Sequence, residues 1–198
     1  MDNYVITISR QFGSLGRSIA KKVAHKLNID YYDRDLIEKA AALLNEDLKT
    51  ISTIDESINL PFANALFPLG IGTGAVHKRL FKIQESLIHD CISKGNCLIV
   101  GRCADYIFKD YSRRFNVMIY APFEERLKNS INDLRIPEYE VANYVRKIDK
   151  ARDSYHKFFT GEPLDTLKYR DLLIDSSALS QDDLADVIIE AARKKLHF

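Results

Sequence analysis

Long apolar runs are missing from this chain of 198 residues, and its N-terminus has no basic segment followed by an apolar one. A membrane-spanning helix needs about 20 mostly apolar residues, and a secretory signal needs a charged start and a shorter apolar stretch. Both absences argue against a membrane protein or an exported one. We therefore expect a cytoplasmic protein without a membrane partner.

Clusters of cysteine or histidine are missing as well. Cys91, Cys97 and Cys103 are odd in number and six residues apart, which does not fit the short spacing of zinc sites. The five histidines are scattered and form no ligand pair. We expect reduced, packed thiols, because free cysteine is among the most buried residue types, and we assign the histidines no role.

An excess of charge is also absent, since 29 Lys and Arg residues face 28 Asp and Glu residues for a net charge of +1. Without an overall basic field we expect no nucleic-acid partner, and attraction for anions must come from individual arginines. The composition that remains, 46% apolar and 29% charged, is typical of a globular protein. Its length suits one domain with insertions better than two domains.

Short apolar runs alternate with helical patterns along the chain. The runs predict five β-strands, at 5–8, 31–32, 97–100, 115–120 and 171–175. Apolar residues at helical spacing predict a first helix that begins after Gly16 and a last helix that begins at the capping-box pair Ser180 and Asp183. Between them, the same spacing predicts helices at about 34–44, 75–93, 104–108, 123–132 and 137–156. This alternation predicts an α/β fold with a mostly parallel five-stranded sheet and helices on both faces.

One segment departs from this pattern. Residues 57–77 contain no Asp, Glu, Lys or Arg, and prolines and glycines interrupt their apolar residues. A lid or insertion on the substrate side, a subunit contact in a homodimer, and a loop packed on the core are three interpretations.

A glycine-containing loop separates the first strand from the first helix, where backbone N–H groups and a helix N-terminus can converge on phosphate. The P-loop signature is Gly, four residues, Gly, Lys, then Ser or Thr, whose hydroxyl binds Mg²⁺. Aligned on Gly16, the chain has Gln11 at the first glycine, Arg17 at the lysine and Ser18 at the hydroxyl. We predict that phosphates bind residues Gln11, Phe12, Gly13, Ser14, Leu15, Gly16, Arg17 and Ser18; a glycine turn without a ligand is the alternative.

Arginine in place of lysine affects what this loop can do. A guanidinium grips phosphate through a planar fork, but it is not equivalent to a compact ammonium that follows a moving phosphoryl group. The loop therefore predicts phosphate binding, and it does not by itself predict turnover.

Several further segments have a familiar pattern. With the loop they are Tyr31–Ile37, Leu98–Arg102, Ala121–Arg126, Arg146–Arg152 and Asp171–Ser177. Together they resemble the cytidylate kinase-like family, a nucleoside monophosphate kinase branch of the P-loop kinases. The resemblance implies a three-layer P-loop kinase fold over residues 1–198, with an acceptor-side insertion at about 45–95 and a helical lid at about 136–168. Arginine at position 17 is usual in that branch, whereas Leu15 stands where glycine is common.

The resemblance also implies roles for particular residues. Arg17, Arg102, Arg146 and Arg152 would act on the transferred phosphoryl group, and Asp33, Arg34, Arg102 and Asp105 would contact the acceptor. Asp33 and Asp105 are equally candidates for magnesium contact or for helix caps. Val100 occupies the position of an aspartate that helps to hold magnesium in cytidylate kinases. Arg102 as an ion-pair residue, and Arg146 and Arg152 as a solvated face, are the structural alternatives.

Two hypotheses follow. In the first, the protein uses ATP and Mg²⁺ to phosphorylate a nucleoside monophosphate, such as CMP or dCMP, or a similar small phosphorylated acceptor. In the second, it is a weakly active or inactive nucleotide-binding module, in which bound nucleotide controls segment 57–77 and a partner contact. Gln11, Arg17 and Val100 favour the second hypothesis, while Ser18 and the lid arginines favour the first.

Overall fold

The computed structural model describes residues 3–33 and 74–198. The helix predicted at 34–44, the acceptor residue Arg34 and most of segment 57–77 lie outside the described residues. The division into an acceptor-side insertion and a lid, and the homodimer, therefore stay predictions.

A parallel sheet of five strands forms the centre of the molecule. Its strands are β1 (Val5–Arg10), β2 (Asp30–Tyr32), β3 (Cys97–Val100), β4 (Arg114–Tyr120) and β5 (Leu172–Asp175). They lie side by side in the order β2-β3-β1-β4-β5, and all four pairings are parallel. The five strands predicted from the apolar runs are thus confirmed.

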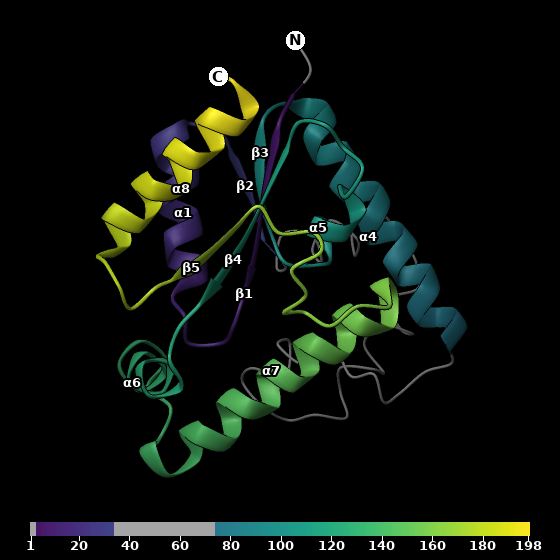
Figure 1. Ribbon diagram of the computed structural model, residues 1–198. Helices are drawn as coiled ribbons and strands as arrows, with labels where there is room; N and C mark the ends of the chain where they lie inside the picture. The colour runs from purple at the N-terminus through teal and green to yellow at the C-terminus, as the bar shows by residue number, and fades with distance from the viewer. Residues whose placement is uncertain (1–2, 34–73) are drawn as a thin grey trace.

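Helices cover both faces of this sheet (Figure 1). On one face lie α1 (Gly16–Leu27) and α8 (Gln181–Leu196), and on the other lie α4 (Gly74–Lys94) and α5 (Ala104–Ile107). Two further helices, α6 (Phe123–Leu134) and α7 (Glu138–Thr160), lie near the carboxyl ends of β1 and β4. This is the three-layer arrangement that the alternating pattern predicted.

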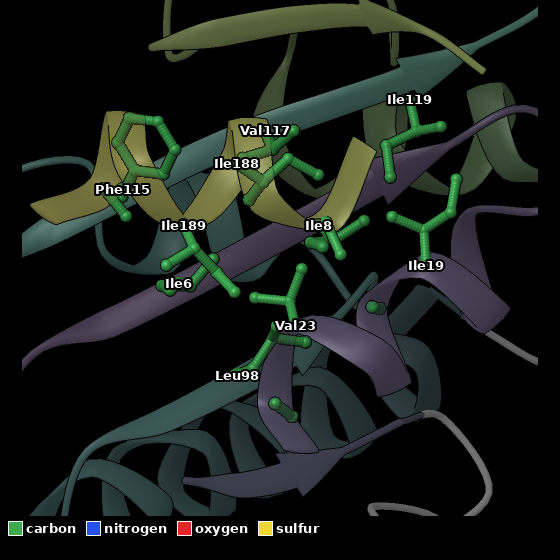
Figure 2. Close-up of a cluster of buried hydrophobic side chains, with 14 of the residues drawn as sticks. Ile6, Ile8, Ile19, Val23, Leu98, Phe115, Val117, Ile119, Ile188 and Ile189 are labelled. Carbon is green, nitrogen blue, oxygen red and sulfur yellow. The ribbon is translucent and has the colours of Figure 1, made fainter. Parts of the chain in front are cut away.

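Side chains of β1 point alternately to the two faces of the sheet, so the strand contributes to the core on both sides. Ile6 and Ile8 face α1 and α8, where they meet Ile19, Val23 and Ile188 (Figure 2). Val5 belongs to the cluster on the opposite face, with residues of α4 and α5. Because successive side chains of a strand point to opposite faces, one short apolar run supplies both layers of the core.

Two predicted helix starts and the predicted thiol state are found as well, whereas α7 continues to Thr160, beyond the predicted residue 156. Pro137 lies directly before α7, and the Ser180 hydroxyl accepts a hydrogen bond from the Asp183 backbone N–H at 3.2 Å, as the capping box predicts. All three cysteines are free and buried, and burial raises the pKa of Cys97 to about 12. Within residues 3–33 and 74–198, no helix has the length and apolar character to cross a membrane.

Candidate active site

The loop between β1 and α1 is braced by its own side chains. The buried Ser14 hydroxyl lies 2.9 Å from the Gln11 carbonyl oxygen and 3.2 Å from that of Ile119. The Gln11 amide oxygen accepts a hydrogen bond from the Ala121 N–H at 3.3 Å. These two side chains therefore shape the loop, and backbone N–H groups are what it can offer to phosphate.

Two positions of the loop need a left-handed backbone. Gly13 has φ +75°, and a Cβ there would overlap the Arg126 carbonyl oxygen and lie 2.7 Å from the Ser130 hydroxyl of α6. Leu15 has φ 57°, the region that favours glycine. This geometry explains why glycine suits position 15, although the Leu15 side chain packs on the core next to α1.

Arg17 and Asp33, predicted on the donor and acceptor sides, meet at the end of β2. The Arg17 guanidinium lies 2.5 Å from the Asp33 carboxylate, which is buried while the arginine is half exposed. The Tyr31 hydroxyl donates to the same carboxylate at 3.3 Å. Burial and the charge of Asp33 raise the pKa of Tyr31 to about 12, so the phenol stays a donor. The ion pair holds Arg17 beside the loop.

The fit to magnesium is limited to one hydroxyl. Ser18 donates a hydrogen bond to the Gln181 side chain at 2.6 Å, on the exposed side of α1. Val100 is fully buried in the core and provides no ligand. Among the residues that the structure describes, no group of three His, Cys, Asp or Glu could hold a metal ion. A single hydroxyl would fit only a Mg²⁺ ion whose remaining ligands are phosphate oxygens and water.

A cavity of about 80 Å³ lies at the carboxyl ends of β1 and β3, against one face of α7. Arg10, Arg102, Arg152 and His156 line it, and Asp105 is the acidic residue in its wall. The surroundings are therefore strongly cationic and suit an anionic ligand. In open α/β sheets, ligands bind at this edge of the strands.

A tight turn after β3 directs Arg102 into this cavity. Gly101 has φ +76°, and a Cβ there would overlap the guanidinium of Arg10. Arg102 has φ 56°, is 9% exposed, and stacks its guanidinium over the Tyr155 ring at 5.2 Å. The absence of a side chain at Gly101 lets two arginines from neighbouring strands approach the same space.

Asp105 is buried at the start of α5 and binds two cationic side chains. Its Oδ2 atom lies 3.0 Å from His156 Nε2 and 2.6 Å from Arg170 Nη1. Burial alone would raise the pKa of Asp105, but the His156 hydrogen bond and the Arg170 charge outweigh it and lower the pKa. Its Oδ1 atom is buried without a hydrogen-bond partner in the described parts of the chain.

The two predicted lid arginines lie on different sides of α7. Six residues along an α-helix correspond to a rotation of about 240°. The Arg146 guanidinium lies 4.8 Å from the Phe123 ring of α6, whereas that of Arg152 lies 5.4 Å from the Phe12 ring and donates to the Arg10 carbonyl oxygen at 3.3 Å. The structure therefore brings Arg152, and not Arg146, to the cavity.

Between these arginines, Asp149 ties α7 to the phosphate loop. Its carboxylate accepts a hydrogen bond from the Phe12 N–H at 2.7 Å and forms an ion pair with Arg126 of α6. Arg126 also donates to the Phe12 carbonyl oxygen at 3.2 Å. The beginning of the loop is thus clamped by two helices.

Sequence reasoning did not assign site roles to Asp149, Tyr155, His156 or Arg170. One signal was available, because Asp149, Arg152 and His156 are spaced three and four apart and so share a helix face. Arg170 gave no comparable local signal.

The parallel sheet, the two covering layers and the glycine loop before α1 define a P-loop kinase fold. Within this class the chain belongs to the cytidylate kinase-like family, whose model matches residues 5–178. This confirms the resemblance found in the sequence.

A curated relative agrees with this assignment, and two solved structures share the fold. A cytidylate kinase from Sulfolobus acidocaldarius is 26% identical over 202 residues, covering 97% of this chain and 96% of the relative. The crystal structure of an uncharacterized protein from Eubacterium ventriosum has a TM-score of 0.75 and 24% identity, covering 97% of this chain and 99% of that one. A gluconokinase from Sinorhizobium meliloti has a TM-score of 0.56 and 9% identity, covering 99% and 95%; these structures support the fold. Family membership supports phosphoryl transfer of the kinase type.

Proposed function

We propose that the protein transfers the γ-phosphoryl group of ATP to a nucleoside monophosphate of the CMP or dCMP type. The observation that carries this proposal is the cationic cavity lined by Arg10, Arg102 and Arg152, next to the phosphate loop. A phosphate-bearing acceptor placed there would face a donor held by the loop. The similarity to a cytidylate kinase supports a cytidine nucleotide as acceptor.

The roles of the residues follow from their positions. Backbone N–H groups of residues 13–18 and the N-terminus of α1 would hold the donor phosphates, with Arg17 beside them. Arg10 and Arg102 would bind the acceptor phosphate, and Asp105 and Asp33 would accept hydrogen bonds from the acceptor. Arg152 would neutralise charge on the transferred group, whereas Arg146, which lies over Phe123 of α6, is assigned no contact with it. Bound Mg²⁺ would neutralise donor phosphate charge, with the Ser18 hydroxyl as its protein ligand.

The chemistry needs positioning more than acid–base groups. An oxygen of the acceptor phosphate attacks the γ-phosphorus of ATP, the bond to the β–γ bridging oxygen breaks, and ADP leaves. Because the attacking oxygen is already anionic, no general base is required. Orientation and cationic stabilisation supply the rate enhancement.

The test is ADP formation with Mg·ATP and a panel of monophosphates, CMP and dCMP first, measured above the rate without acceptor. We expect acceptor-dependent ADP that falls about 100-fold or more in Arg102→Ala, as for removal of a charge-stabilising donor. The control is Arg193→Ala, an exposed arginine of α8 outside the cavity. No acceptor-dependent ADP from any monophosphate would contradict the proposal.

A nucleotide-binding module without fast turnover is the second candidate. The apolar Val100 and the Ser18 hydroxyl held by Gln181 favour it, because both reduce the protein ligands available to magnesium. Thermal unfolding separates the candidates, since a ligand that binds the native state raises Tm. If ATP raises Tm and Mg²⁺ adds nothing, the module is favoured; if Mg²⁺ increases the shift, the kinase is favoured.

A further inference from the structure

Three buried ionisable side chains join four parts of the fold beside the cavity. Asp105 belongs to α5, His156 to α7 and Arg170 to the connection before β5, and their side chains are 1%, 3% and 0% exposed. Arg170 also donates a hydrogen bond at 3.0 Å to the hydroxyl of Ser9, near the end of β1. Such a network is costly to bury unless each member is paired, so its geometry indicates a specific role.

Each ring nitrogen of His156 lies next to an oxygen that can accept a hydrogen bond. Nε2 lies 3.0 Å from the Asp105 carboxylate, and Nδ1 lies 2.7 Å from the backbone carbonyl oxygen of Glu162. A neutral imidazole has one N–H, whereas an imidazolium has two. The charged form is therefore the one that satisfies both contacts.

The Thr160 hydroxyl has a nearer acceptor than the Nδ1 atom of His156. The hydroxyl lies 3.1 Å from His156 Nδ1, but it lies closer, at 2.7 Å, to the His156 carbonyl oxygen, to which it donates. On loss of a ring proton, one nitrogen lone pair would face either a carbonyl oxygen or a carboxylate. One of the two bonds that hold the end of α7 would then be lost.

The charged groups around His156 come from every neighbouring element. Asp105 and Arg170 contact each other and lie closest to the ring, while Arg10 and Arg102 line the same cavity from the strand ends. Arg152 is on its own helix. Burial alone would lower the pKa of His156, but the hydrogen bond and charge of Asp105 outweigh it and raise the pKa.

The positions of Arg152 and Tyr155 depend on the contacts that His156 makes, because all three residues lie on the same part of α7. They precede His156 by four residues and by one, line the cavity with it, and contact Phe12 and Arg102 respectively. We propose that His156 is a positioning residue, which through Asp105 and the Glu162 carbonyl fixes the C-terminal half of α7 against the sheet and holds Arg152 at the acceptor. This inference rests on the proposed function.

The kinetic test measures KM for the acceptor and kcat from about pH 6 to pH 9 in the wild type, in His156→Gln and in the control His25→Gln, an exposed histidine of α1. In the wild type and the control, we expect acceptor KM to rise about tenfold as His156 loses its proton, with a smaller change in kcat, because misplaced groups weaken positioning. In His156→Gln, KM for the acceptor should already be high at pH 6. It should not change over the pH range in which His156 of the wild type loses its proton. A His156→Gln profile identical to the wild type would overturn the proposal.

Two measurements need no turnover and separate this inference from the proposed function. Ring ¹⁵N NMR of the wild type should show that His156 keeps both ring protons to a higher pH than free imidazole does, and loss of a ring proton at the same or a lower pH would overturn the inference. Amide exchange at fixed pH should be about tenfold faster over residues 152–160 in His156→Gln than in His25→Gln, and equal exchange would also overturn it. If no monophosphate is phosphorylated but both results appear, the proposed function fails while the anchoring of α7 stands.

Discussion

Three consecutive residues at the mouth of the cavity have left-handed backbone conformations: Gly101, Arg102 and Cys103, with φ of 76°, 56° and 55°. For a residue with a side chain this conformation costs about 1–2 kcal/mol. Such strain is retained where the surrounding structure requires it, most often at functional sites. Here the turn places the Arg102 guanidinium over Tyr155 and leaves space above Gly101 for Arg10.

At the scale of single residues, Arg152 and Arg146 should differ in how much each contributes to kcat/KM. Arg152 lines the cavity, whereas Arg146 is exposed and lies over Phe123. We expect Arg152→Ala to lower acceptor-dependent kcat/KM by about 100-fold, as for loss of a transition-state charge partner, and Arg146→Ala to lower it by less. Steady-state kinetics of the two variants decides, and a larger loss in Arg146→Ala would contradict the placement of Arg152 at the acceptor.

Glycine substitutions separate backbone strain from steric overlap. Gly161→Ala meets no atom within 4 Å but has φ +78°, so it should cost about 1–2 kcal/mol of unfolding free energy. Gly13→Ala adds overlap with the Arg126 carbonyl to a similar φ, and should cost about 1–3 kcal/mol more. Gly95→Ala, with open space and no positive φ, is the control. Urea unfolding measures all three; equal losses for Gly13 and Gly161 would refute the clamp by α6.

At the scale of elements, α7 is the part that connects the two halves of the site. Asp149 attaches it to Phe12 of the phosphate loop, and Tyr155 donates to Gln84 of α4 at 2.7 Å. Phe159 stacks on Phe81 at 4.3 Å, which adds a second contact with α4. The helix predicted as a lid is thus attached at both sides of the cavity.

The Asp149 contact predicts a specific effect on the nucleotide donor. Asp149→Ala leaves the Phe12 N–H and the 9%-exposed Arg126 guanidinium without their carboxylate. We expect a stability loss of about 1–3 kcal/mol, the usual cost of leaving a buried hydrogen-bonding group without its partner, because the Asp149 side chain is itself 26% exposed. KM for ATP should rise about tenfold because the loop loses its anchor. Glu140→Ala, also acidic but exposed in the first turn of α7, is the control; an unchanged KM for ATP would refute the coupling.

The helices and strands could be predicted from sequence because they depend on local features. Part of the site could not be predicted because it depends on contacts between residues far apart in the chain. Strands such as 97–100 and the capping pair at Ser180 depend on neighbouring residues, so their pattern is visible in the chain. The pairing of Asp105 with His156 spans 51 residues and depends on how α5 and α7 pack. The clamp of Phe12 by Asp149 spans 137 residues. Contacts of this kind require the fold before they can be identified.

For the whole molecule, the Asp105 and His156 pair predicts how stability depends on pH. The raised pKa of His156 means that its contribution is complete below the usual value of 6.5 and is lost as pH rises through the folded-state value. The lowered pKa of Asp105 means that its contribution is complete above 3.8 and is lost as pH falls through the folded-state value. The pair should therefore stabilise most between these two values.

Urea unfolding at a series of pH values tests this dependence. The difference in unfolding free energy between wild type and His156→Gln should be largest near pH 5–6 and should shrink at higher pH. His25→Gln should show no such pH-dependent difference. A difference that grows with pH would mean that His156 is buried as the neutral ring.

The central claim is that the cavity between β1, β3 and α7 binds the acceptor phosphate, and a calorimetric titration tests it most directly. CMP, or the monophosphate that yields most ADP, is titrated into wild type, Arg102→Ala and Arg193→Ala. We predict the same Kd for Arg193→Ala as for wild type, and a Kd about tenfold or more higher for Arg102→Ala, since a charge-assisted phosphate contact is worth about 1.5–3 kcal/mol. An unchanged Kd for Arg102→Ala would contradict the account and place the acceptor elsewhere.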